Sequence, residues 1–369
     1  MKIVHLETGR HRYGGPQQVL QLMNRLAELG HDNTLLGATD SEVLAHARLA
    51  GHRIEALATI GDADVSLIPR LARRFSRLAP DIVHVHSRRG ADLYGGPAAR
   101  LVGLPTLLTR RVDNPVSALG ARWRFRPYRR IVAVSDAVRA ALDAAQVAPE
   151  RIVVIRDAID VAPLVLSPEH DWFSQTFGVP KGVPLIGAIA QFIPRKGHRY
   201  LLDVLPTVIE RLPSARLLLF GRGPLEAELR ALAHERGLSE HVVFGGFRRD
   251  MDRVLPCLDL VVHPATAEGM GVALLEAAAA AVPVVAFAAG GIKEVVVDGE
   301  TGVLVPVGDT AALGAAITAL LADKRRTEAF GVAARRRIEQ AFSVADHAAR
   351  HEALYTAVMA EERADNEPG

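Results

Sequence analysis

The chain has 369 residues, 49% of them apolar, and a formal net charge of +2. Its length exceeds that of one typical core and predicts two domains, and the small net charge argues against non-specific nucleic-acid binding as its main task. Its single cysteine, Cys257, excludes an intramolecular disulfide framework and a metal site built from several cysteines.

Short runs rich in Val, Ile and Leu alternate with amphipathic stretches through the first half of the chain. We expect strands at 2–6, 81–87, 105–111, 130–135 and 151–157, and helices at 14–30, 91–103 and 136–146. Gly30 is a typical stop for the first of these helices. The alternation predicts a mostly parallel sheet with helices on both of its faces.

The alternation lapses between 161 and 183, where a proline-rich stretch predicts a linker, and then resumes. Further strands are expected at 184–192, 215–221, 241–247, 258–265, 283–289 and 301–307, and helices from about 326 and 344. The sequence thus predicts an N-terminal domain at 1–165, a C-terminal domain at 166–345, and a helix and tail at 346–369 that could pack back on the first domain. Two such sheets facing each other enclose a cleft, and they bind ligands beyond the carboxyl ends of their strands.

One strand-to-helix loop, AEGMGVALLEAAA at 267–279, places Glu268 and Glu276 eight positions apart. Gly269 and Gly271, which follow the first acid, allow a ligand close to the backbone, and the N–H groups of a helix start favour phosphate. Glu276 suits ribose hydroxyls, as acids do in other nucleotide sites. The alternative is an ordinary surface helix whose start is capped by Glu268.

A second loop, AQFIPRKG at 190–197, ends with Arg195 and Lys196 where a helix begins. Cations there oppose the helix dipole, and a bound phosphate resolves the conflict; the alternative is a solvated basic loop. A third loop, RYGGPQQ, puts Gly14 and Gly15 before the first helix. These glycines allow close approach of the backbone but lack the G-x-G-x-x-G fingerprint of dinucleotide sites.

Three weaker features have structural alternatives. His84 and His86 alternate along an expected strand and could bind a metal, but packing is the better interpretation because no third ligand is assigned to them. Asp62 and Asp64 form a D-x-D pattern that suits N-capping of the next helix. RWRFRPYRR, residues 122–130, could bind anionic lipid headgroups, a phosphorylated glycan or nucleic acid, or it is a solvated face.

Taken together and in this order, the motifs resemble those of the retaining nucleotide-sugar glycosyltransferases of family 4, which have the GT-B fold. The family's E-x7-E resembles Glu268 to Glu276, its GRLxPxKG resembles AQFIPRKG, and its VIPNGID resembles the end of RIVVIRDAID. PVVAFAAGGIKEVVVDGETGVLV, at 283–305, resembles the block that follows the acid pair. The resemblance covers nearly the whole chain and implies an α/β GT-B fold, with two Rossmann-like domains facing each other across a cleft.

The resemblance also implies roles for single residues. Glu276 would bind the donor ribose and Glu268 the hydroxyls of the donor sugar. Lys196, with Arg195 beside it, would neutralise the diphosphate, so the residues assigned to catalysis are Glu268, Lys196 and Arg195. The other expected donor-binding residues are Gly14, Gly15, Gln191, Phe247, Gly269, Met270, Gly271 and Val272. On the acceptor side we expect His86, Arg111 and Asp113.

The chain departs from the family pattern at three places. Gln191 stands where the family has a phosphate-binding arginine, and Arg195 could compensate. Arg111 stands at the histidine of the family's T-F-H pattern, with Asp113 soon after, which leaves open the residue that assists acceptor deprotonation. Arg156-Asp157-Ala158 replaces the PNG of the segment between the domains.

These features predict a glycosyltransferase that moves a sugar from a nucleotide-diphosphate donor to a glycan or lipid-linked acceptor, such as a cell-envelope polysaccharide or lipopolysaccharide, with retention of configuration. Negative charge builds on the departing diphosphate, so fixed cations and N–H groups lower the barrier most. A sugar-nucleotide epimerase on the same fold and a non-catalytic nucleotide-sugar binder remain alternatives. The missing fingerprint disfavours a nicotinamide dehydrogenase.

We expect no cofactor, no required metal and no nucleic-acid partner, because the nucleotide-sugar is a co-substrate. The apolar run in MKIVHLETGR is too short for a signal peptide, and Glu276 and Pro283 interrupt the apolar stretch around 272–289, so no membrane span is predicted. The expected location is cytoplasmic. The Arg-rich N-terminal half leaves open a peripheral association with the anionic inner face of the cytoplasmic membrane.

Overall fold

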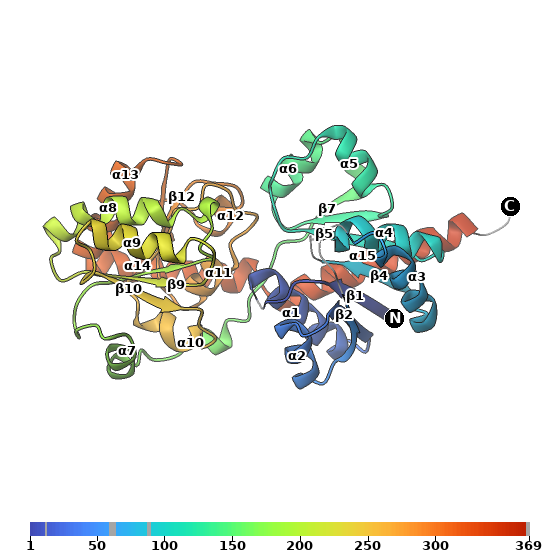
Figure 1. Cartoon of the computed structure of the whole chain (residues 1–369), viewed down its shortest axis with the longest axis horizontal. Coiled ribbons are helices and arrows are strands. Elements are labelled where there is room, and N and C mark those ends of the chain that lie inside the picture. Colours follow the sequence, from blue (N-terminus) through green and yellow to red (C-terminus); the bar gives the residue numbers. More distant parts are fainter. Residues whose placement is uncertain (12, 59–63, 87–89, 367–369) are drawn as a thin grey trace. The chain divides into compact units, whose positions relative to one another are not determined.

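The computed structural model describes residues 1–369 except 12, 59–63, 87–89 and 367–369. Its contacts divide the chain into two compact units, Met1–Ala158 with Val344–Gly369, and Ile159–Ser343 (Figure 1). The first unit therefore ends at Ala158, earlier than the expected boundary at 165, and it includes the C-terminal helix.

A seven-stranded parallel sheet forms the centre of the first unit. Its strands are β1 (Lys2–Glu7), β2 (Asp32–Ala38), β3 (Arg53–Leu57), β4 (Ile82–Val85), β5 (Thr106–Arg110), β6 (Arg130–Ala133) and β7 (Ile152–Val154). In the order β3-β2-β1-β4-β5-β6-β7, the chain builds outward from β1 to one edge and then from β4 to the other. The carboxyl ends of β1 and β4 therefore mark the switch point at which such sheets bind ligands.

The helices of this unit connect its strands, except the last, which follows the second unit in sequence. They are α1 (Gly14–Glu28), α2 (Glu42–Leu49), α3 (Leu67–Leu78), α4 (Ala91–Leu101), α5 (Ala118–Phe125), α6 (Asp136–Ala144) and α15 (Val344–Asn366). Ser41, Ser117 and Ser135 cap α2, α5 and α6, because each hydroxyl accepts from the backbone N–H three residues on.

The last helix completes the core of the first unit. Tyr355 and Val358 of α15 pack with Ile3 of β1 and Leu107 of β5 in one buried cluster. Although α15 has 23 residues, charged side chains interrupt it. Within the described part of the chain, no helix is both long and apolar enough to cross a bilayer.

The second unit is built on a six-stranded parallel sheet. Its strands are β8 (Leu185–Ile189), β9 (Arg216–Phe220), β10 (Val242–Gly246), β11 (Leu260–His263), β12 (Val284–Phe287) and β13 (Gly302–Val305). The order β10-β9-β8-β11-β12-β13 places the switch point between β8 and β11. The helices are α7 (His170–Phe177), α8 (His198–Arg211), α9 (Glu226–Glu235), α10 (Met251–Val254), α11 (Val272–Ala279), α12 (Ile292–Val295), α13 (Thr310–Ala322) and α14 (Lys324–Ala341).

The doubly wound α/β architecture predicted from the sequence is confirmed, but several elements were not predicted, among them α2, α5, β2, β3 and α7. β2 and β3 lie at one edge of the first sheet, and β3 is only five residues long and largely half-exposed. Helix α7 falls inside the stretch expected to be a linker. Phe173 and Phe177 of this helix pack together with ring centroids 4.7 Å apart, and Gly178, with φ 65°, ends it.

Candidate active site

The switch point of the second sheet brings two loops into contact. One runs from the end of β8 through Arg195 and Lys196 to Gly197, and the other follows β11. Gly197 has φ 71°, and a Cβ atom there would lie 2.0 Å from the carbonyl oxygen of Pro264. Only glycine allows this approach. The N–H of Thr266 then donates to the carbonyl of Arg195 at 2.9 Å, which fixes the two loops side by side.

Lys196, Glu268 and His263 form a buried polar group across these loops. The Nζ atom of Lys196 and Oε2 of Glu268 form an ion pair, and Nε2 of His263 lies 3.0 Å from the same oxygen. The two charged side chains are only 12% and 10% exposed. His263 is the last residue of β11, so the sheet itself sets the position of its ring.

The electrostatics of this group keep Glu268 ionised. Burial alone would raise the pKa of Glu268, but the ammonium of Lys196 and the hydrogen bond from His263 outweigh it and hold that pKa well below the ordinary value. Burial lowers the pKa of His263, so its neutral ring donates Nε2–H to the carboxylate.

The group can bind both an anion and hydroxyls. An ammonium has three N–H donors and a carboxylate about four acceptor positions. The ion pair and the imidazole use only part of this capacity. A phosphate beside Lys196 and a hydroxyl beside Glu268 are therefore chemically suited to this point.

The loop after Glu268 is held close to its neighbours by glycines. The N–H of Gly291 donates to the carbonyl of Glu268 at 2.9 Å, and a Cβ atom at Gly291 would lie 2.1 Å from the carbonyl oxygen of Gly269. Met270 is buried, and Gly271, with φ 91°, is the N-cap of α11. Val272 begins the helix and Glu276 lies one turn further, half-buried, so this helix start presents backbone N–H groups beside Glu268.

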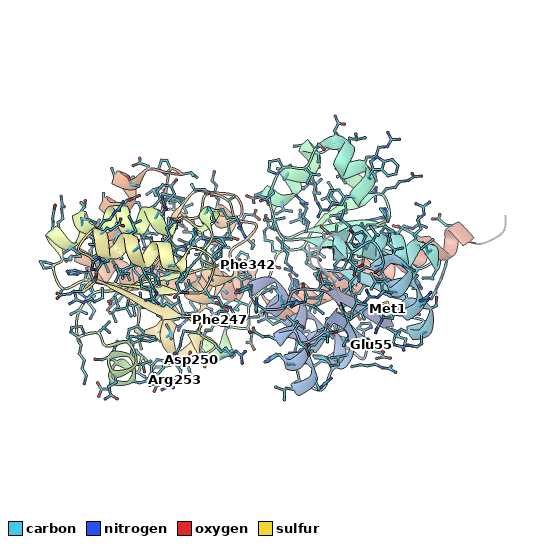
Figure 2. The ribbon with its side chains drawn as sticks, in the orientation of Figure 1. Met1, Glu55, Phe247, Asp250, Arg253 and Phe342 are labelled. Atoms are coloured by element: carbon cyan, nitrogen blue, oxygen red, sulfur yellow. The ribbon has the colours of Figure 1, made fainter. Side chains whose placement is uncertain are left out.

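The other expected residues of the second unit make no direct contact with Lys196 or Glu268 among the interactions of the described residues. Arg195 donates from Nη1 to the carbonyl of Ala267 at 3.2 Å, so the structure gives it a bracing role between the loops. Gln191 is half-buried just beyond β8. Phe247 follows β10, two strands from β8, on the segment that also carries Asp250 and Arg253 (Figure 2). The guanidinium of Arg222 lies 4.7 Å from the centre of the Phe247 ring.

In the first unit, the structure joins two departures from the family pattern into one contact. Arg111, just beyond β5, forms an ion pair with Asp157, and the two side chains are 14% and 4% exposed. A Cβ atom at Gly15 would lie 3.3 Å from Cδ of Arg111, so Arg111 lies against the start of α1, where Gly14 and Gly15 stand. Asp113 lies two residues beyond Arg111 and is half-buried.

Sequence analysis missed a buried histidine network around the switch point of the first sheet. His5 of β1, His84 of β4 and the adjacent His86 are buried, and α15 adds His347 and His351. One ring nitrogen of each of the first three histidines lies within 4.8 Å of the others, so they could hold a metal ion. The i, i+4 spacing of the two histidines in α15 was the available signal, but only the fold brings them to β4.

Hydrogen bonds fix the tautomers along part of this network. Asn33 donates its amide to the carbonyl of His31 at 3.1 Å, so its oxygen accepts from Nε2 of His5 at 3.0 Å. Nδ1 of the neutral His5 must then accept from Nε2 of His86, also at 3.0 Å. His86 is left with an unprotonated, buried Nδ1 that has no partner among the described residues.

His84 is the hub of the same network. Its Nδ1 lies 2.7 Å from the hydroxyl of Tyr355, and its Nε2 lies 2.7 Å from Oγ1 of Thr109. A metal would have to displace one of these bonds, so the present geometry is that of a hydrogen-bonded network. Of the D-x-D pair, Asp62 lies outside the described residues, and Asp64 pairs with Arg70 at 3.2 Å.

Comparison with known families matches both halves of the chain. A model of the family described as "Glycosyl transferases group 1" matches residues 171–337. A second model, described as "Glycosyltransferase Family 4", matches residues 13–162.

Two similar proteins are GDP-mannose-dependent alpha-(1-6)-phosphatidylinositol monomannoside mannosyltransferases. The protein from Mycolicibacterium smegmatis is 38% identical over 168 residues, which are 41% of this chain and 42% of that relative. The protein from Mycobacterium tuberculosis is 30% identical over 261 residues, which are 60% of this chain and 68% of that relative. The chain thus spans less than half of the first relative and about two thirds of the second.

Among solved structures, HepE of Anabaena in complex with UDP and glucose has the same fold. Its TM-score is 0.86 at 22% identity, over 97% of this chain and 100% of that chain.

Proposed function

The chain belongs to the GT-B glycosyltransferases, and on that premise we propose that it transfers a hexose from a nucleoside-diphosphate donor to a glycan or lipid-linked acceptor with retention of configuration. The observation that carries this proposal is the contact of Lys196 with Glu268 at the switch point of the second sheet. The match of the N-terminal half to a family 4 model supports retention.

In this proposal the second unit holds the donor. Lys196 neutralises the diphosphate, and the N–H groups at the start of α11 support its phosphates. Glu268 accepts hydrogen bonds from the sugar hydroxyls, and Glu276 accepts them from the ribose. Arg195 braces the two loops, and Phe247 supplies an apolar surface for the base. Because Lys196 and Glu268 are already paired before the donor arrives, little reorganisation is needed when the leaving group gains charge.

The chemical step follows from retention without an enzyme nucleophile. The bond from the anomeric carbon to phosphate breaks with its electron pair leaving on the diphosphate, and the acceptor oxygen bonds to the same face of the sugar. The acceptor hydroxyl approaches the departing phosphate oxygen on that face and transfers its proton to this oxygen. Lys196 lowers the barrier by stabilising the charge that develops on the diphosphate.

The first unit supplies the acceptor side in this proposal. Gly14 and Gly15, at the start of α1, are proposed for the donor rather than the acceptor, because their backbone allows close approach of a phosphate. Arg111, which lies against Gly15, supplies a cation suited to an anionic acceptor, and the bare Nδ1 of His86 can accept a hydrogen bond from a hydroxyl. Asp113 stands further along the same loop.

A donor screen tests the proposal. We expect GDP-mannose, the donor named for the relatives, to raise the melting temperature more than UDP-glucose or ADP-glucose. Mass spectrometry with a panel of glycans and phosphatidylinositol glycolipids should then show transfer, and NMR of the product should show the anomeric configuration of the donor. Sugar-nucleotide conversion without any acceptor would instead indicate an epimerase, which the relatives do not favour.

Matched variants separate effects on the catalytic step from general effects of substituting a charged residue. Lys196→Ala and Glu268→Gln should each lower kcat by about 100-fold or more. Glu228→Gln should leave kcat unchanged, because it breaks only the exposed ion pair with Arg199. Full activity of the Glu268 and Lys196 variants would refute the assignment of the site.

We further propose that transfer needs no metal and takes place in the cytoplasm beside the membrane, in cell-envelope synthesis. The lipid acceptor named for the mycobacterial relatives supports this location. Treatment with EDTA should leave the rate unchanged; a loss of activity restored by a divalent cation would contradict metal independence.

A further inference from the structure

The structure divides the arginines of the segment RWRFRPYRR, residues 122–130, into two groups. Arg124 donates from Nε to Asp92 at 3.0 Å. Arg129 pairs with Glu362 and Asp365 of α15 at 2.6 and 3.0 Å, and Arg130 pairs with Glu361. These three cations have internal partners: Arg124 joins α5 to α4, and Arg129 and Arg130 join the start of β6 to α15.

The other two arginines are exposed and form no ion pair with any residue that the structure describes. Arg122 and Arg126 stand three and seven positions after Leu119, and Trp123 stands four positions after it, so all four side chains share one face of α5. Leu119 is 69% and Trp123 71% exposed. We call these four residues the α5 face.

The opposite side of the helix is anchored. Ala121 and Phe125 are buried, and the Ser117 hydroxyl caps the helix through the N–H of Gly120. Figure 1 shows α5 at the periphery of its unit, beside α6. The fold therefore fixes the α5 face outward, with two large exposed apolar side chains beside two cations that form no ion pair with the described residues.

We propose that the α5 face docks on an anionic lipid bilayer. Tryptophan favours the interface between water and hydrocarbon, and leucine can insert below the headgroups. The two guanidiniums provide several donors each for lipid phosphates, and their unpaired charge complements a negatively charged leaflet. A helix of eight residues gives reversible binding. The proposal does not depend on the proposed function, because bilayer binding can be measured without turnover.

Tryptophan fluorescence gives a direct test. The chain has two tryptophans, Trp123 and Trp172, so the Trp172→Phe variant makes Trp123 the only reporter, and its melting temperature checks that the fold is kept. With vesicles of phosphatidylcholine containing about 30% phosphatidylglycerol, emission should shift to the blue and quenching by acrylamide should fall. Vesicles of phosphatidylcholine alone should cause neither change.

Vesicle sedimentation of the full chain tests whether the residues of the α5 face contribute to binding. Arg122→Ala with Arg126→Ala should weaken binding to the anionic vesicles by about tenfold or more, and Leu119→Ala with Trp123→Ala should weaken it as well. Raising the salt from about 50 to 300 mM should weaken binding of the unmodified chain.

A matched pair on another helix is the control. Val332 and Arg336 of α14 are likewise exposed and four positions apart, so their replacement by alanine should leave binding unchanged. Equal binding to neutral and anionic vesicles, or unchanged binding after loss of Arg122 and Arg126, would overturn the proposal. So would concentration-dependent self-association that needs Leu119 and Trp123 and proceeds without vesicles, because it would assign the α5 face to a second copy of the chain.

Discussion

Glu268 is a buried carboxylate whose charge depends on two neighbours. Lys196 forms an ion pair with it, and His263 lies 3.0 Å from the same oxygen. Since burial by itself opposes ionisation, the carboxylate stays charged only while these partners remain.

Lys196→Met should therefore destabilise the second unit. The variant leaves Glu268 buried without its cation, so its pKa should rise, and the free energy of unfolding should fall by about 3 kcal/mol. Urea denaturation measures the loss, and NMR titration of the carboxyl measures the pKa. Lys196→Arg, which keeps the charge, should retain most of the stability; an unchanged pKa in the methionine variant would contradict the electrostatic account.

A similar loss of stability is expected in the first unit when the ion pair of Arg111 with Asp157 is broken. Arg111→Ala removes the ion pair of the buried Asp157 with Arg111 and should lower the free energy of unfolding by about 3 kcal/mol. Adding Asp157→Asn removes the buried charge that Arg111 balanced and should recover about 1 kcal/mol or more. Additive effects of the two substitutions in a double-mutant cycle would show that the ion pair does not couple them.

At the scale of single residues, the sequence indicates which loops carry the site residues, but it does not show which of these residues contact each other. Glycines and charges next to Val-rich strands indicated that Lys196 and Glu268 lie in strand-to-helix loops. The two residues are 72 positions apart, so their ion pair depends on the adjacency of β8 and β11. In the same way, Arg111 and Asp157 were visible only as two separate departures from a pattern.

At the scale of the elements, a glycine sets the contact between the two loops of the site. Gly197 combines a positive φ with an approach to the Pro264 carbonyl that no Cβ atom fits. Gly182 has nearly the same φ, 73°, but nothing lies within 4 Å of its absent Cβ.

This contrast gives a matched pair of substitutions. Gly182→Ala should cost about 1 kcal/mol, because it adds only left-handed backbone strain. Gly197→Ala should cost clearly more and should also weaken donor binding, since the loops must separate. Calorimetry of unfolding and a donor titration measure the two effects. Equal costs for both variants would show that the close approach is unimportant.

Elements with a local signature were predictable, and others were not. The strands at the centre of each sheet are runs of Val, Ile and Leu, and the C-terminal stop of α1 was visible at Gly30. Helix α7 was hidden because its eight residues lie between prolines and its aromatic packing, as of Phe177 on Phe173 and Phe220, is visible only in the fold. The edge strand β3 lacks the apolar run of its neighbours.

At the scale of the whole molecule, buried histidines make the first unit sensitive to acid. Burial lowers the pKa of His5 to about 4 and that of His351 to about 3. Burial, together with neighbouring charges that include Arg111, lowers the pKa values of His84, His86 and His347. In the unfolded chain these groups take up protons near their ordinary value of 6.5.

The unfolded state therefore binds more protons below that value, and stability should fall as pH drops from 6.5 toward 4. Melting temperatures between about pH 7.5 and 5 measure this loss. His351→Gln removes one of the titrating groups and should make the decline shallower. A melting temperature independent of pH across this range would show that the network does not control stability.

The first unit is assembled from both ends of the sequence, because α15 completes a core that begins with β1. During translation, residues 344–366 leave the ribosome only after all of the second unit has been synthesised. Until then the first unit lacks α15, which packs with α1 over Ile3 and Leu107, while the second unit, which is continuous in sequence, can fold as soon as it is synthesised. The second unit can thus fold independently, whereas the core of the first unit is completed only after residues 344–366 have been synthesised.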